Sequence, residues 1–199
     1  EKVCFTEKPD SLLVYGDTNS TLAGALAAVK LHIPVIHIEA GLRSFNMRMP
    51  EEINRILTDQ VSSILFCPTE TAIKNLHNEG FDKKSVKILN VGDVMQDSSL
   101  YFAQLAKKSD ALNNFPNKDF IVATLHRAEN TDNPERLKAI INALNYIHQN
   151  VLPIILPLHP RTKKMVNSLG LNLSMKVIEP VGYLEMIWLL KNSSAVVTD

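Results

Sequence analysis

Residues 120–158, FIVATLHRAENTDNPERLKAIINALNYIHQNVLPIILPL, decide the fold class. Two apolar runs typical of buried strands, 120–124 and 154–158, enclose a stretch with helical spacing. Asn133 is placed to cap that helix, and Pro134 takes its first position, where a missing N–H costs nothing. The apolar face follows at the spacing of a helix packed on one side, at Leu137, Ile140, Ile141, Leu144 and Ile147. The stretch therefore predicts a strand–helix–strand unit with parallel strands.

The same alternation continues in both directions along the chain. Further buried strands are predicted at 11–15, 34–38, 64–67, 176–178 and 195–198. Helices are predicted over 69–79 and 97–107. This pattern predicts an α/β fold with parallel sheets covered by helices on both faces. The least apolar stretch, 107–119, is the predicted boundary between two halves, 1–107 and 108–199.

Composition excludes several classes of protein. The 199 residues are 45% apolar and 21% charged, as in ordinary globular domains, and no apolar run has the length of a membrane span. Lys+Arg and Asp+Glu are 21 each, so nothing favours binding to nucleic acid or to an anionic membrane. Cys4 and Cys67 form neither a metal-binding cluster nor a disulfide framework, which is typical of a reducing compartment and predicts the cytoplasm.

Both ends of the chain are abrupt. It opens at Glu1 without a signal peptide, and it closes at Asp199 directly after the strand predicted at 195–198. Domains rarely stop on a buried strand, so we expect the chain to be a piece of a longer polypeptide.

Ionisable residues follow the predicted strands at the point where each strand ends. They are Asp17, Glu39, His126, His159 and Asp199. In open parallel sheets, ligands bind beyond the carboxyl ends of the strands. Carboxylates in the first half and histidines in the second are suited to acid/base chemistry on an anionic ligand.

Structural roles for the same residues remain open. Asp17 could cap the helix that follows it, and Glu39 could pair with Arg43 as a local ion pair. His37 alternates with its neighbours inside a strand, so we predict a core histidine with its hydrogen bonds satisfied.

A pair of glutamates begins the helix that starts at Pro50. Acidic residues in a first turn are favoured by the helix dipole, and Glu51 could also pair with Arg55 one turn later. Glu52 points about 100° away from Glu51. We therefore expect only one of the two to face a site.

Five motifs occur in order along the chain. They are Gly16-Asp17-Thr18, residues 37–44 (HIEAGLRS), 50–55 (PEEINR), 68–70 (PTE) and 126–130 (HRAEN). Together they resemble the non-hydrolysing UDP-N-acetylglucosamine 2-epimerase family. The hydrolysing branch carries Gly-Asp-Arg at the first motif, which favours the isomerising branch. Three other segments, 44–49, 90–97 and 182–188, resemble members that act on UDP-2,3-diacetamido-2,3-dideoxyglucuronate.

The resemblance implies two Rossmann-like halves around a cleft, as in GT-B glycosyltransferases, with this chain a fragment of the full fold. It implies inversion of C2 of a UDP-linked 2-acetamido sugar, through loss and return of UDP, for surface polysaccharide precursors. The implied partners are the UDP-sugar and a second copy in a homodimer, with no metal, redox cofactor, nucleic acid or membrane. A GT-B glycosyltransferase and a non-catalytic sugar-nucleotide sensor remain alternatives.

The resemblance also implies roles for individual residues. The implied catalytic groups are Asp17, Glu39, Glu51 and His126, the last on the diphosphate side. The implied substrate-binding residues are Arg43, Arg127, Glu129, His159 and Met186. Within that set, Arg127 and Glu129 are expected to orient His126 or its loop, and His159 to touch a second, activating UDP-sugar. Met186 stands where relatives carry an aromatic residue near the uridine.

Overall fold

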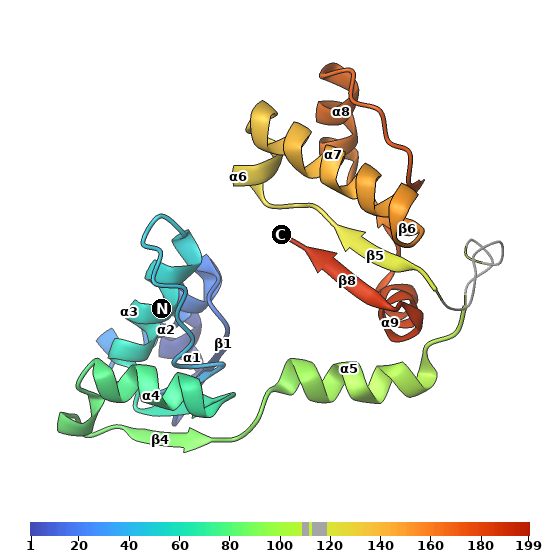
Figure 1. Cartoon of the computed structure of the whole chain (residues 1–199). Coiled ribbons are helices and arrows are strands. Elements are labelled where there is room, and N and C mark those ends of the chain that lie inside the picture. The colour runs from blue at the N-terminus through green and yellow to red at the C-terminus, as the bar shows by residue number, and fades with distance from the viewer. Residues whose placement is uncertain (109–111, 113–118) are drawn as a thin grey trace. The chain divides into compact units, whose positions relative to one another are not determined.

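The computed structural model describes residues 1–108, 112 and 119–199, and the chain divides into two compact units, 1–97 and 98–199 (Figure 1). The division falls inside helix α5 (Val94–Leu105), whereas we expected it after residue 107. Most of the expected boundary stretch, 107–119, lies outside the described residues. Helix α5 begins earlier than predicted because the Asp93 carboxylate accepts hydrogen bonds from the backbone N–H groups of Met95 and Gln96.

Unit 1 contains a parallel sheet with the strand order β1-β2-β3-β4. Its strands are β1 (Leu12–Tyr15), β2 (Val35–Ile38), β3 (Ile64–Cys67) and β4 (Lys87–Asn90). Its helices are α1 (Lys2–Glu7), α2 (Asn19–Lys30), α3 (Pro50–Val61), α4 (Glu70–Asn78) and the 3-10 turn η1 (Phe81–Lys83). One core cluster joins β1 and β2 to α2, and a second joins β3 to α4 and η1.

Unit 2 contains a parallel sheet with the strand order β7-β6-β5-β8. Its strands are β5 (Ile121–Thr124), β6 (Ile154–Pro157), β7 (Lys176–Ile178) and β8 (Ala195–Thr198). Its helices are α6 (Ala128–Thr131), α7 (Pro134–Asn150), α8 (Pro160–Ser168) and α9 (Tyr183–Asn192). After β7 the chain crosses back over the sheet, so that the last strand, β8, pairs with the free side of β5.

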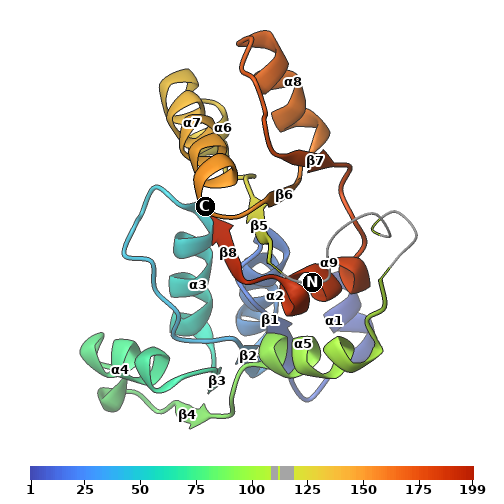
Figure 2. The same ribbon diagram turned by 45° about the vertical axis from the view of Figure 1, so that its right-hand side comes forward.

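Alternate residues of the central strands of unit 2 face opposite layers. Ala123 and Leu156 pack with Leu144 of α7 on one side. Val122 packs with Trp188 of α9 on the other. Figure 2 shows α7 and α9 on opposite sides of this sheet. The near-continuous apolar character of β5 and β6 follows from this two-sided cover.

Each strand predicted from the sequence is present, with ends that differ by no more than one residue. The capped helix is confirmed, since the Asn133 side chain accepts a hydrogen bond from Arg136 N and α7 starts at Pro134. Strand β4 was missed, because Lys87 and Asn90 leave only two apolar residues between them. The expectation that 195–198 is buried is wrong: β8 is the edge strand of its sheet and all four of its residues are exposed.

Both cysteines, Cys4 and Cys67, are buried and free. Across the described residues, helices are too short or too polar to cross a lipid bilayer.

Candidate active site

The carboxyl ends of β1 and β2 bring Asp17 and Glu39 to the same edge of the first sheet. The N–H of Gly16 donates to the carbonyl of Ile38 at 3.1 Å, which joins the two strand ends. Gly16 has a φ of +62°, and a Cβ added there would lie 3.2 Å from Oε2 of Glu39. The Glu39 carboxylate therefore lies directly against the residue that precedes Asp17.

Asp17 is held by α3. Its Oδ2 accepts a hydrogen bond from Arg55 Nη2 at 2.6 Å, and its backbone carbonyl accepts one from Asn54 Nδ2 at 2.9 Å. The alternative that Asp17 caps the next helix is wrong, because Thr18 is the cap and its hydroxyl accepts from Thr21 N. Since the Asp17 side chain is still 34% exposed, its carboxylate remains accessible to a ligand.

The two glutamates at the start of α3 have different surroundings. Glu52 is buried and accepts hydrogen bonds from the N–H groups of Ser44 and Phe45, at 2.9 and 2.8 Å. Arg55 approaches Glu52 and Asp17, so the pairing considered between the side chains of Arg55 and Glu51 does not form. Among the described residues, the exposed Glu51 carboxylate has no hydrogen-bond or ion-pair partner.

Arg43 is engaged inside unit 1. Its buried guanidinium donates to Asp59 Oδ2 at 2.8 Å, and to both carboxylate oxygens of Glu79 at 2.7 and 2.8 Å. It also donates to the carbonyl of Leu42. The alternative of a Glu39–Arg43 ion pair is therefore wrong. The geometry favours Arg43 as an anchor of the segment after β2 over direct contact with a ligand.

Electrostatics set Glu39 apart from its neighbours. Burial raises the pKa of Glu39, and the negative charges of Asp17 and Asp93 raise this pKa further. The charges of Arg55 and His37 oppose the rise without cancelling it. A carboxyl group with a raised pKa holds its proton at higher pH than an ordinary glutamate, which suits a group that both accepts and donates a proton.

Replacing Asp93 with Asn should lower the pKa of Glu39, because it removes a negative charge that disfavours the glutamate anion. Asn caps helices as well as Asp does, so α5 should keep its start. The measurement is a carboxyl-carbon NMR titration, with the Glu39 signal assigned from a Glu39→Gln sample. Asp97→Asn, also in the first turn of α5, is the control and should leave the midpoint in place. A midpoint in Asp93→Asn that stays or rises would contradict the prediction.

In unit 2, polar groups meet at the carboxyl ends of the paired strands β5 and β8. The Asp199 carboxylate accepts hydrogen bonds from the N–H groups of His126 and Arg127 and from Asn130 Nδ2. It also lies 2.9 Å from Nδ1 of His126, whose side chain is 66% exposed. Burial acts to raise the pKa of Asp199, but hydrogen bonds from Asn130, Arg127 and His126 outweigh it and hold the pKa below its ordinary value. An ionised Asp199 therefore fixes the loop that carries His126.

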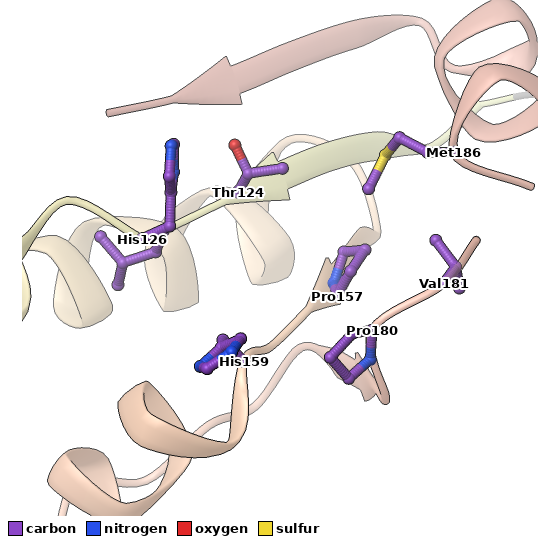
Figure 3. A pocket seen from close by; sticks show the side chains of 8 residues that line it. Thr124, His126, Pro157, His159, Pro180, Val181 and Met186 are labelled. Carbon is purple, nitrogen blue, oxygen red and sulfur yellow. The ribbon is translucent and has the colours of Figure 1, made fainter. Parts of the chain in front are cut away.

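A cavity of about 290 Å³ lies beside this loop. It is lined by Thr124, Leu125, His126, Pro157, His159, Pro180, Val181 and Met186. Figure 3 shows the His126 ring turned toward β8 and away from His159, with Met186 reaching in from α9. The sequence-predicted residues His126, His159 and Met186 thus share one cavity. Arg127 caps α6 through its backbone, and the Glu129 side chain is exposed in the first turn of that helix.

Asp59 is the residue of this region that sequence reasoning missed. Helix α3 buries four polar residues, Glu52, Asn54, Thr58 and Asp59. It exposes Ile53 and Leu57 at 39% and 42%. A rule that places the apolar face inward therefore predicts the wrong orientation for this helix. The available signal was the spacing of Asn54, Thr58 and Asp59, which lie on one side of a helix.

Both sheets define an α/β protein of Rossmann type, with ionisable groups at the carboxyl ends of the strands. Known proteins of this kind match the chain along its whole length. The family model for UDP-N-acetylglucosamine 2-epimerase matches residues 1–199, and the chain belongs to that family. The resemblance to its non-hydrolysing members, drawn from five motifs, is confirmed.

Individual relatives are similar to the chain in sequence and in structure. UDP-2,3-diacetamido-2,3-dideoxy-D-glucuronate 2-epimerase of Pseudomonas aeruginosa is 67% identical over 199 residues, which are 100% of this chain and 56% of that protein. A solved structure of the Methanocaldococcus jannaschii UDP-GlcNAc 2-epimerase with UDP-GlcNAc and UDP is 47% identical, with a TM-score of 0.84 over 100% of this chain and 57% of that one. A solved structure of the Neisseria meningitidis UDP-GlcNAc 2-epimerase bound to UDP-GlcNAc is 33% identical to this chain. Its TM-score is 0.85, over 100% of this chain and 56% of that one. The chain thus spans about half the length of these relatives, and the GT-B-like fold class is confirmed.

Proposed function

We propose that the full-length protein inverts C2 of a UDP-linked 2-acetamido sugar by eliminating and re-adding UDP. The observation that carries the proposal is the pair of carboxylates at the ends of β1 and β2, one with a raised pKa, in a chain whose whole length matches the 2-epimerase family. A group that can both accept and donate a proton is what inversion at a C–H centre requires.

The bond changes of this reaction balance without a redox cofactor. The C2 proton passes to a base while the C1–O bond breaks. The electron pair of the C1–O bond leaves with the UDP oxygen, and that of the C2–H bond moves between C1 and C2. A C1=C2 double bond results. A proton then reaches C2 on the opposite face, and the UDP oxygen re-forms its bond to C1.

We assign the proton transfers to the carboxylates of unit 1. Asp17 and Glu39 approach the same point of the sheet edge, and Arg55 keeps Asp17 in place. Glu51 is exposed and without a partner in the described residues, so it is available for a third contact with the sugar. Because the reaction runs both ways, the roles of base and acid exchange between the two directions.

We assign the diphosphate to the His126 loop of unit 2. Nδ1 of the His126 ring lies 2.9 Å from Oδ1 of Asp199, which leaves Nε2 on the other side of the ring to face an anionic oxygen. The positively charged guanidinium of Arg127 belongs to the same loop. The negatively charged carboxylate of Glu129 lies in the first turn of α6. His159 and Met186 line the adjacent cavity, which we propose for parts of the nucleotide sugar.

Product analysis without an acceptor tests the proposal. The full-length protein is incubated with UDP-N-acetylglucosamine alone, and the products are separated and examined by proton NMR. We expect a mixture of the two C2 epimers. Sugar transfer that appears only when an acceptor is added would favour a GT-B glycosyltransferase, and binding without turnover would favour a sensor.

The 67% identity to the Pseudomonas aeruginosa enzyme favours a second candidate substrate, UDP-2,3-diacetamido-2,3-dideoxyglucuronate. The same site chemistry applies to it, because only the substituents at C3 and C6 differ. Comparing kcat/KM for the two UDP-sugars decides between them. A higher value for UDP-N-acetylglucosamine would contradict the uronate as the natural substrate.

We further propose that the protein acts in the cytoplasm as a homodimer, in the synthesis of surface polysaccharide precursors. The sparse, free cysteines and the resemblance to the family support this. Light scattering of the full-length protein measures the assembly directly, and a monomer at micromolar concentration would contradict the dimer.

A further inference from the structure

The buried side chains of His37 and Asp59 contact backbone groups close to Asp17 and Glu39 in the chain. Asp59 and His37 are both fully buried, and Oδ1 of Asp59 lies 2.7 Å from Nδ1 of His37. Oδ2 of Asp59 accepts from the N–H of Gly41 at 3.1 Å and from Arg43 at 2.8 Å. The prediction that His37 is a satisfied core histidine is confirmed, and Asp59 is the partner of one of its two ring nitrogens.

The contacts of Asp59 bracket Glu39 in the chain. His37 lies two residues before Glu39, and Gly41 lies two residues after it. Glu39 itself has a φ of +74°, in the left-handed region that residues with a Cβ rarely adopt. Such a conformation persists only where surrounding contacts enforce it. The two oxygens of one buried carboxylate contact the His37 ring before this residue and the Gly41 N–H after it.

The same group reaches the strand that carries Asp17. Nε2 of His37 lies 2.8 Å from the carbonyl oxygen of Gly16. Both ring nitrogens of His37 thus face acceptors, and both bonds form together when the ring donates from each nitrogen. The Arg43 guanidinium pairs with the carboxylates of both Asp59 and Glu79.

We propose that Asp59 is a positioning residue that keeps Glu39 in its left-handed conformation and in register with Asp17. Asp59, His37 and Gly41 are named here the Asp59 clamp. The inference deepens the proposed function and rests on it for its kinetic test only. Asp59 touches no substrate. It acts by fixing where the Glu39 carboxylate stands, and a displacement of about 1 Å at such a group can cost as much as 100-fold in rate.

The kinetic test is a double-mutant cycle in the full-length protein with Asp59→Asn and Glu39→Gln. We expect Asp59→Asn to lower kcat by about 10- to 100-fold while KM changes little. In the Glu39→Gln background the same change should cost nothing more, because the group it positions is gone. An equal loss in both backgrounds would overturn the proposal, since a merely structural role lowers the active fraction regardless of Glu39.

Asp82→Asn is the matched control, since Asp82 forms an ion pair with His77 that is exposed. It should leave kcat unchanged, whereas a loss equal to that of Asp59→Asn would overturn the proposal. His37→Gln tests the second arm of the Asp59 clamp if Asp59→Asn folds poorly. It should show the same dependence on Glu39, and an equal loss in both backgrounds would count against the clamp.

A thermal test stands apart from the reaction. With Asp59 present, Glu39→Gly should melt about 2–4 °C higher than Glu39→Ala, because glycine adopts the left-handed conformation without strain. In the Asp59→Asn background this order should vanish or reverse. An unchanged order would overturn the proposal. The difference in melting temperature could disappear in the Asp59→Asn background while the full-length protein shows no epimerisation. That result would refute the proposed function and support the Asp59 clamp.

Discussion

Glu39→Gln is expected to lower kcat for C2 inversion by about 10²- to 10⁴-fold, the usual contribution of a positioned acid or base. Glutamine keeps the shape of the side chain but cannot exchange a proton. Burial, and then the negative charges of Asp17 and Asp93, raise the pKa of Glu39, which suits this carboxyl group to hold and release a proton. Steady-state turnover of the UDP-sugar by the full-length protein measures the effect.

The matched control for this substitution is Glu7→Gln, which makes the same change at an exposed position of α1. It should leave kcat at the level of the unchanged protein. KM for the UDP-sugar should change much less than kcat in Glu39→Gln, because the group acts on the proton at C2. Retention of more than about a tenth of the turnover would remove Glu39 from the chemistry.

Gly41→Ala is expected to lower the free energy of unfolding by about 3–5 kcal/mol. An added Cβ meets closer neighbours at Gly41 than at the other glycines. Gly41 has a φ of +77°, and a Cβ there would lie 2.5 Å from the backbone carbonyl oxygen of Ala72. That oxygen belongs to α4 and cannot move aside as a flexible side chain could. Any shift of Gly41 also loosens its hydrogen bond to Asp59.

Gly80→Ala separates the clash from the backbone strain. Gly80 has nearly the same φ, +81°, but nothing lies within 4 Å of an added Cβ. Its substitution should cost only the strain of a left-handed residue, about 1–2 kcal/mol. Urea unfolding of both variants gives the comparison. Equal destabilisation of the two would show that the contact with Ala72 does not matter.

The sequence was most informative where one periodic signal dominated. Strands β5 and β6 are buried on both faces, so their apolar runs are continuous, and α7 carries both a cap and an apolar stripe. Strand β4 has neither signal, because it lies at an edge of its sheet and only two of its residues are apolar. The exposure of β8 was also missed, because an apolar run does not reveal whether a neighbour covers it.

The candidate site at the carboxyl ends of β1 and β2 could be predicted only in part. Asp17 and Glu39 were found because they follow apolar strands directly. The contacts that hold this part of unit 1 join residues far apart in the chain: Arg55 lies 38 residues after its partner Asp17, and Asp59 lies 22 residues after its partner His37. No local spacing reports such pairs. Helix α3 hides them further, because it turns its polar face inward and so reverses the usual rule for amphipathic helices.

Solvent hydrogen at C2 provides the most direct measurement. The full-length protein is incubated with UDP-N-acetylglucosamine in heavy water, without any acceptor, and the sugar is examined by proton NMR. Carboxylates that remove and return the C2 proton predict deuterium at C2 in both epimers, with incorporation strongly slowed in Glu39→Gln. A sugar that is turned over but keeps its original hydrogen at C2 would contradict the account.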